Sequence, residues 1–363
     1  MKSRSGDLLP LTSEPCVTQG GCSISGDTRA DENIALYSMH TVWIREHNRI
    51  ATHLKRKHPS YNEEKLYQET RKIVIAELQN VVFNEWVPNI VNIGRYTGYN
   101  QWLDATIINA FSTAAFRFGH SLVPNQWIQL NANYDQARRS VSLQESFNDI
   151  RTINNHGIEP IVLGLVGNYS NKVDTNFAFG IARRLFVRPG ANTHMDLTAF
   201  NIQRGRDHGI KTYGAWRKFC NLPKINTFRQ LARHMPGKIA KKFQKIYKNP
   251  NDIDLFAAGI AENPMTGYQT GPTFRCIFWH QFLRSRDGDR FYFENRGVFT
   301  NRQVSELRKS SMSKILCDNL KGVVSMTRKA FHQTTSKRPL CNCLLYTSPS
   351  PRDKRQSRMP SSA

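Results

Sequence analysis

Two short stretches of this sequence combine a histidine, an asparagine and several arginines at short spacings. Residues 115–121 read AFRFGHS, with Arg117 three positions before His120, and residues 200–209 read FNIQRGRDHG, with Asn201 three positions before Arg204. An imidazole can ligate iron, and a side-chain carbonyl can hold its Nδ1–H. Arginines can bind an anionic cofactor. Residues three apart lie on one face of a helix, so each stretch can present its pair together.

Each pair also has a structural interpretation. From its pattern alone, His120 could be a histidine at the end of a helix, stabilised by the helix dipole. Asn201 and Arg204 could belong to the solvated face of an amphipathic helix. A third pair, Arg29 and Glu32 in the stretch GDTRADEN, could be a surface ion pair worth about 0.2–0.5 kcal/mol.

The motifs together resemble the animal-type haem peroxidase family, in the same order and at similar spacing. The resemblance covers roughly residues 15–335 and includes five further stretches besides His120 and Asn201: residues 26–33, 38–49, 216–220, 286–291 and 296–300. We interpret the helix over 38–49 as structural, with His40 and His47 buried or hydrogen-bonded rather than ligating a metal. Because the motifs lie in separate parts of the sequence, their joint match makes the resemblance to this family specific.

The resemblance assigns roles to the two proximal stretches. It implies that His120 is the proximal iron ligand and that Asn201 accepts a hydrogen bond from its Nδ1–H. It also implies that Arg117 and Arg204 hold the haem propionates. An asparagine partner leaves the imidazole neutral, so its influence on the redox potential should be milder than that of a carboxylate.

On the distal side, the resemblance implies that Arg29 polarises bound peroxide and stabilises charge as the O–O bond breaks. Glu32 would form an ester to a haem methyl group. Asn33 stands where some family members have a methionine, so no sulfonium link is expected. The family's distal histidine and calcium-binding segments have no counterpart before Arg29. The resemblance therefore predicts a haem b site without its calcium site, and slow turnover for the chain alone, because general base catalysis is worth about 10²–10⁴-fold.

The implied reaction is reduction of hydrogen peroxide with oxidation of halide or small organic donors. The net charge of +23 could attract an acidic matrix polysaccharide. Nucleic acid is not an expected partner, because no zinc-finger, RNA-binding or basic-leucine pattern is present. The sequence contains no run of 18 apolar residues, so it does not predict a membrane-spanning helix. Two alternatives remain open: a catalytically impaired, peroxidase-like module that binds matrix polyanions, or an unstable fragment.

The chain contains seven cysteines and no CxxC pair, a pattern that favours disulfides over a metal cluster. The resemblance pairs Cys16 with Cys22, Cys220 with Cys276, and Cys317 with Cys341 or Cys343. It also implies an extracellular location. The first residues lack the apolar core of a secretory signal, so we expect the signal to lie outside this sequence. Residues 168–170, Asn-Tyr-Ser, form the only N-glycosylation sequon.

The apolar periodicity predicts a mainly α fold with few short strands, in a single large domain over residues 15–336. We expect a poorly ordered start over 1–14 and a disordered tail, foreign to the fold, over 337–363. The short strand candidate is 291–293. The predicted helices cover 29–57, 63 to Pro88, 102–120, 146–153, 174–186, 194–208, 228–248, 252–262, 272–285 and 301–316.

Overall fold

The fold is mainly helical, as the periodicity predicts. A computed structural model describes residues 7–186, 194–332 and 338–344. The described elements, in chain order, are α1 (Ile34–Lys57), α2 (Glu63–Asn80), η1 (Val81–Trp86), η2 (Val87–Asn89), α3 (Asn109–Thr113), η3 (Ala115–Ser121), β1 (Gln126–Leu130), β2 (Gln136–Ser142), η4 (Gln144–Ser146), α4 (Arg151–His156), α5 (Glu159–Gly167), α6 (Phe179–Ala182), α7 (Leu197–Asp207), α8 (Tyr213–Phe219), α9 (Phe228–Leu231), α10 (Gly237–Ile246), η5 (Pro250–Asp252), α11 (Leu255–Ala261), α12 (Pro272–Asp287), α13 (Asn301–Leu307), α14 (Met312–Asn319) and α15 (Cys341–Leu344).

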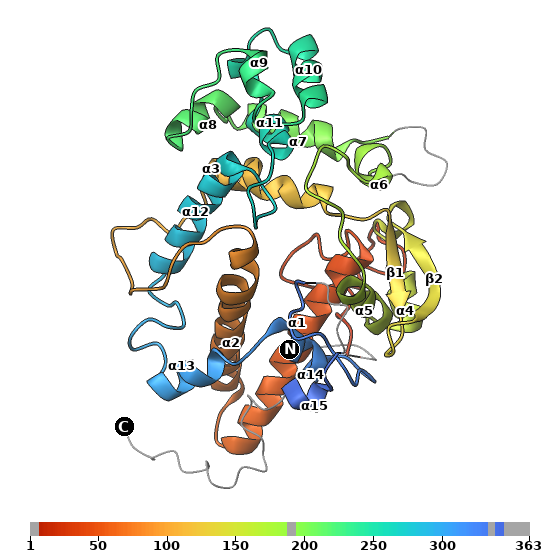
Figure 1. Cartoon of the computed structure of the whole chain (residues 1–363). Helices are drawn as coiled ribbons and strands as arrows, with labels where there is room; N and C mark the ends of the chain where they lie inside the picture. Colours follow the sequence, from red (N-terminus) through yellow and green to blue (C-terminus); the bar gives the residue numbers. More distant parts are fainter. Residues whose placement is uncertain (1–6, 187–193, 333–337, 345–363) are drawn as a thin grey trace.

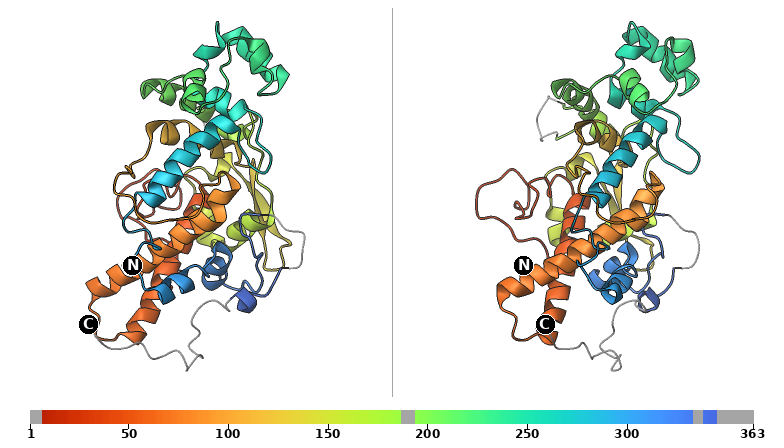
Figure 2. Two further views of the ribbon diagram at one scale, coloured as in Figure 1. Left: turned by 60° about the vertical axis from the view of Figure 1, so that its left-hand side comes forward. Right: turned by 90° about the vertical axis from the view of Figure 1, so that its left-hand side faces the viewer.

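Most of the buried apolar side chains form two large clusters. The helices and the hairpin that carry them are drawn in Figures 1 and 2. The first core joins α1 to the hairpin, α4, α5 and α14 through residues such as Ile34, Trp127, Ile161 and Ile315. The second core joins α3 and η3 to the helices from α8 to α12, and it is rich in aromatic rings such as Phe111, Phe118, Phe274 and Phe278. The candidate site residues on η3 and α7 lie beside the second core, and Arg29 and Glu32 lie in the turn before α1 of the first core.

Helix α1 begins at Ile34 because Asn33 caps it. The Asn33 side chain accepts hydrogen bonds from the backbone N–H groups of Ala35 and Leu36, which would otherwise lack partners. Three basic residues, Lys55, Arg56 and Lys57, occupy the last turn, where their positive charges interact favourably with the negative end of the helix dipole. The predicted helix over 29–57 is therefore right in its end and five residues early in its start.

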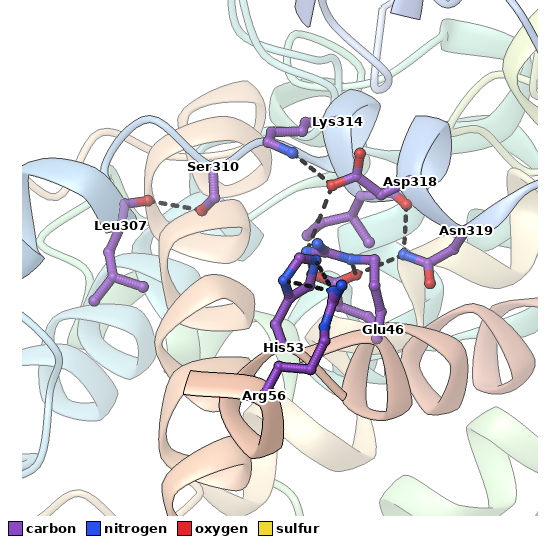
Figure 3. Close-up of polar contacts among 10 residues, drawn as sticks. Glu46, His53, Arg56, Leu307, Ser310, Lys314, Asp318 and Asn319 are labelled. Atoms are coloured by element: carbon purple, nitrogen blue, oxygen red, sulfur yellow. Dashed lines mark hydrogen bonds and ion pairs between the residues drawn. The ribbon is translucent and has the colours of Figure 1, made fainter. Parts of the chain in front are cut away.

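A buried polar cluster connects α1 with α14 (Figure 3). The Asn319 amide donates to Glu46 Oε2 at 2.6 Å, and Lys314 pairs with Asp318 at 2.5 Å. Arg49 donates two hydrogen bonds to Glu46, from Nε and Nη2. The charges in the cluster are paired, so it links the two helices without leaving an unmatched ion in the interior.

The antiparallel hairpin of β1 and β2 was not predicted, and the predicted strand over 291–293 is wrong, because those residues form turns. Helix α5 packs so closely on β1 that a Cβ at Gly164 would lie 1.8 Å from the Ile128 carbonyl oxygen. Glycine is required there. Helices α5 and α8 were not predicted from the sequence. Of the helix predicted over 174–186, only α6 (Phe179–Ala182) is helical.

Three disulfides lie within the loop before α1, between the end of α8 and α12, and between α14 and α15. Cys16–Cys22, Cys220–Cys276 and Cys317–Cys341 are all formed, which confirms the two predicted pairs and settles the alternative at Cys317.

Residues near both ends pack further than the sequence indicated. Leu8 and Leu9 are buried in the first core, although the start was expected to be poorly ordered. The disordered tail was expected to begin at residue 337. The backbone N–H of Cys341, however, donates to Val324 O, so residues 338–344 pack against the fold. The segment 345–363, which holds the rest of that tail, lies outside the described residues. No described helix is long and apolar enough to cross a membrane.

Candidate haem site

His120 lies near the end of η3, a short 3-10 helix that follows α3. Ala115 and Phe118 are buried and anchor η3 to the second core, and Ser121 is buried beside them along the chain. Burial lowers the pKa of His120 to about 4, the nearby Arg117 charge adds to this effect, and Asn201 opposes it. The imidazole is therefore neutral at neutral pH, which is the form that ligates iron.

Asn201 comes from α7, which Asp196 caps through hydrogen bonds to the N–H groups of Thr198 and Ala199. The Asn201 side chain is fully buried, and its Nδ2 lies 3.0 Å from His120 Nδ1. Its Oδ1 accepts a hydrogen bond from Arg117 Nη1 at 2.9 Å. The structure thus brings these three predicted residues into one connected network.

The direction of the hydrogen bond to His120 differs from the one expected. A guanidinium can only donate, so the Asn201 oxygen must face Arg117 and the amide nitrogen must face the ring. Nδ1 then accepts, and the ring proton is on Nε2. The expected bond, with Nδ1–H as donor, requires Arg117 to release the amide so that it can turn over.

Three arginines gather on this side of the molecule. The pKa of Arg117 is lowered by burial and then by the charges of Arg204 and Arg29. Within the part of the chain that the structure describes, the Arg117 side chain donates only to the Ser112 carbonyl and the Asn201 amide. Arg204 is exposed and, among the described residues, pairs with no carboxylate. Arg117 and Arg204 are therefore neighbouring cations without a carboxylate partner among the described residues, an arrangement that favours the binding of an anion.

On the distal side, Arg29 pairs with Asp27 rather than with Glu32. Asp27 accepts from the backbone N–H, Nε and Nη2 of Arg29 at 2.8, 3.0 and 2.8 Å, and these bonds hold the Asp27 pKa below its usual range. Burial raises the pKa of Glu32, and the positive charge of Arg29 opposes this increase. Sequence reasoning missed Asp27; the signal was its position two residues before the arginine, where an aspartate commonly forms a local turn.

The residues present fit a haem in three respects. The imidazole is neutral, the surrounding arginines can pair with two propionates, and the backbone beside them is uncovered. A Cβ added at Gly119 or at Gly205 would meet no atom within 4 Å, so a planar group can approach next to His120 and Arg204. Among the described residues, no group of three or more His, Cys, Asp or Glu side chains could hold a metal ion by itself.

The site draws its two sides from different cores. Arg29 and Glu32 lie in the turn before α1, next to Ala30 and Ile34 of the first core, whereas His120 lies on η3 of the second core. Along the chain, α2 lies between α1 and the segment of α3 and η3. The cofactor would therefore bind elements of both cores.

Comparison with known proteins identifies the family. The profile of the animal haem peroxidase family matches residues 1–331. This chain belongs to the animal haem peroxidase family, and the resemblance in its sequence motifs is confirmed.

Individual relatives agree with the family assignment. The chain is 39% identical over 352 residues to human peroxidasin homolog, covering 90% of this chain and 24% of that protein. It is 37% identical over 357 residues to human eosinophil peroxidase, covering 93% of this chain and 50% of that protein. Peroxidase A from Dictyostelium discoideum superimposes with a TM-score of 0.81 at 29% identity, covering 91% of this chain and 66% of the other. The chain thus spans about a quarter of the length of the first human relative and half of the length of the second.

Proposed function

We propose that this chain forms the haem-binding part of a peroxidase that reduces hydrogen peroxide and oxidises halide ions or small organic donors. The observation that carries the proposal is a buried, neutral His120 joined to Asn201 and Arg117. Membership of the family supports it. The cofactor is haem b, and a bound haem supplies the iron that passes the oxidising equivalents of peroxide to the donor.

In this proposal, the proximal residues hold and orient the cofactor. His120 offers Nε2 to the iron, and Asn201 fixes the plane of the imidazole through Nδ1. Arg117 and Arg204 pair with the propionates, where a guanidinium can form two parallel hydrogen bonds to one carboxylate. When Arg117 turns to a propionate, the Asn201 oxygen becomes free to accept from Nδ1–H.

The distal residues act on peroxide and on the edge of the cofactor. Arg29 donates to the peroxide oxygens and stabilises the charge that develops as their bond breaks. Asp27 holds the Arg29 side chain in a fixed orientation through two hydrogen bonds. Glu32, with its raised pKa, is the carboxyl that would be joined to a haem methyl group as an ester. Forming that C–O bond would remove one hydrogen from the methyl group and the proton from the carboxyl, and hydrogen peroxide would accept the two electrons and be reduced to two molecules of water.

The proposed location is extracellular. Three disulfides, Cys16–Cys22, Cys220–Cys276 and Cys317–Cys341, support it, because disulfides persist in oxidising compartments and are rare in the cytosol.

The distal role of Arg29 is tested by the rate at which peroxide changes the Soret band of the haem-loaded chain. Removal of one preorganised donor costs roughly 10²–10³-fold in rate, so we expect Arg29→Ala to slow the change by that factor without altering haem affinity. Arg29→Lys should retain part of the rate. The matched control is Arg138→Ala, an exposed arginine of β2, which should react like the wild type. An unchanged rate for Arg29→Ala would contradict the role.

A further inference from the structure

Residues 168–170 form a sequon, Asn-Tyr-Ser, at the end of α5. The backbone N–H of Asn168 closes the helix by donating to Gly164 O at 3.0 Å. Asn168 itself has extended backbone angles, with φ −118° and ψ 160°, so the chain leaves the helix at this residue. All three sequon residues are exposed, and the Tyr169 side chain is 67% exposed.

The side chain of Asn168 is available for modification. Among the described residues, none forms a hydrogen bond with its amide, whereas neighbouring asparagines are engaged. Asn171 donates to Val123 O at 2.8 Å, and Asn125 accepts from the N–H of Phe179 at 2.7 Å. Modification at Asn168 therefore breaks no contact of the fold, unlike modification at either neighbour.

The surface around the sequon can accommodate a bulky group. Asn168, Tyr169 and Ser170 form one wall of an open cavity whose remaining lining is mostly apolar, including Leu122, Trp127 and Leu165. Apolar surface in contact with water is unfavourable. A sugar chain that begins at the rim of this cavity would cover part of it.

The disulfides indicate the compartment independently of the sequon. Cys16–Cys22, Cys220–Cys276 and Cys317–Cys341 form in an oxidising compartment, and in eukaryotic cells the secretory pathway that supplies these conditions also modifies Asn-X-Ser/Thr sequons. We propose that Asn168 is a site of N-linked glycosylation. In the reaction, the amide nitrogen bonds to the first sugar of a lipid pyrophosphate-linked oligosaccharide. The sugar–phosphate bond breaks, the lipid pyrophosphate leaves, and the amide loses one proton.

The test is expression of the chain behind a secretory leader in mammalian cells, followed by treatment of total cell and medium fractions with peptide N-glycosidase. We expect the wild-type chain to lose mass on treatment, and Asn168 to be converted to aspartate at that position in the mass spectrum. Asn168→Gln and Ser170→Ala should show no change of mass, whereas Ser170→Thr should behave like the wild type. Cell fractions are included so that a variant retained inside the cell is still measured.

A positive control makes a negative result decisive. In the hairpin turn, Asp135→Ser creates the triplet 133–135 with the same middle residue, tyrosine, and Asn133 is exposed. The double variant Asn168→Gln, Asp135→Ser should regain one glycan. If this control is modified while the wild-type chain is not, or if Asn168→Gln keeps the wild-type mass loss, the proposal is overturned. The result does not depend on haem or on peroxidase activity.

Discussion

At the scale of single residues, the central feature is an asparagine that serves two partners. Asn201 contacts His120 through one amide atom and Arg117 through the other. Because the amide has one donor end and one acceptor end, the state of Arg117 determines which atom of Asn201 faces the imidazole. The network therefore relates the binding of an anion at Arg117 to the hydrogen bond that orients His120.

Replacement of Asn201 by aspartate should shift the His120 pKa upward. In Asn201→Asp, a carboxylate lies beside Nδ1 and favours the protonated ring, and an opposite charge at this distance changes a pKa by about 1–3 units. The wild-type value is about 4. NMR titration of the His120 ring in the haem-free chain measures the shift.

We expect Asn201→Asp to change the haem-loaded chain as well. A carboxylate raises the basicity of the ligand more than an amide does, so the iron reduction potential should fall. The control Asn92→Asp adds an equal charge at an exposed loop position and should change neither quantity. A His120 pKa that stays at its wild-type value in Asn201→Asp would show that the contact between the two side chains is absent in solution.

At the scale of elements, the packing of α1 against α2 buries two carboxyl groups. Glu46 is paired with Arg49, and its pKa is lowered although burial opposes this. Burial, and after it the negative charge of Glu46, raise the pKa of Glu77 well above its ordinary value of 4.5, with Arg49 and Lys314 opposing. Glu77 is therefore the member of the pair that keeps its proton.

This pairing predicts a pH-dependent stability. Because the folded chain holds the Glu77 proton above pH 4.5 while the unfolded chain releases it, the free energy of unfolding falls as the pH rises through this range. Glu77→Gln stays neutral and keeps the shape, so it should be more stable than the wild type at pH 8, by about 1.4 kcal/mol for each unit of pKa shift. The two should be equal below pH 4.

Urea unfolding across pH 4 to 8 measures the difference. Glu69→Gln is the matched control, since Glu69 lies on the same helix and is exposed. A wild-type advantage over Glu77→Gln at pH 8 would contradict the assignment of the proton.

The elements also show where sequence reasoning succeeds. Helix α1 could be predicted because its apolar residues recur at helical spacing, its last turn is basic, and Pro59 follows its end. The hairpin of β1 and β2 could not be predicted, because β2 is exposed along most of its length and has no alternation of apolar and polar residues to indicate a strand. Helix α5 is apolar on every side, with Ile161, Val162, Leu163 and Gly164 all buried, so it has no amphipathic period to detect.

The same limits apply to the site. The positions of Arg117, His120 and Asn201 could be inferred from motifs, because each stretch carries its own spacing. Two features could not: the partner of Arg29, which is Asp27, and the orientation of the Asn201 amide. Both depend on which side chains meet in three dimensions, and spacing along the chain does not encode that.

At the scale of the whole molecule, the proposed haem site takes its residues from elements of both apolar cores. The turn that carries Arg29 belongs to the first core and the helix that carries His120 to the second. A ligand that contacts both would stabilise the folded chain by mass action, by about 2.7 kcal/mol at a free concentration one hundred times its dissociation constant. Haem should therefore raise the melting temperature of the whole chain.

The measurement that tests the account most directly is a haem titration of the purified chain followed by its Soret absorbance. Wild type should give a saturable, sharp band, and His120→Ala should lose it. The control His156→Ala changes an exposed histidine at the end of α4 and should bind like the wild type. A band of equal intensity and position in His120→Ala would contradict the claim that His120 is the iron ligand.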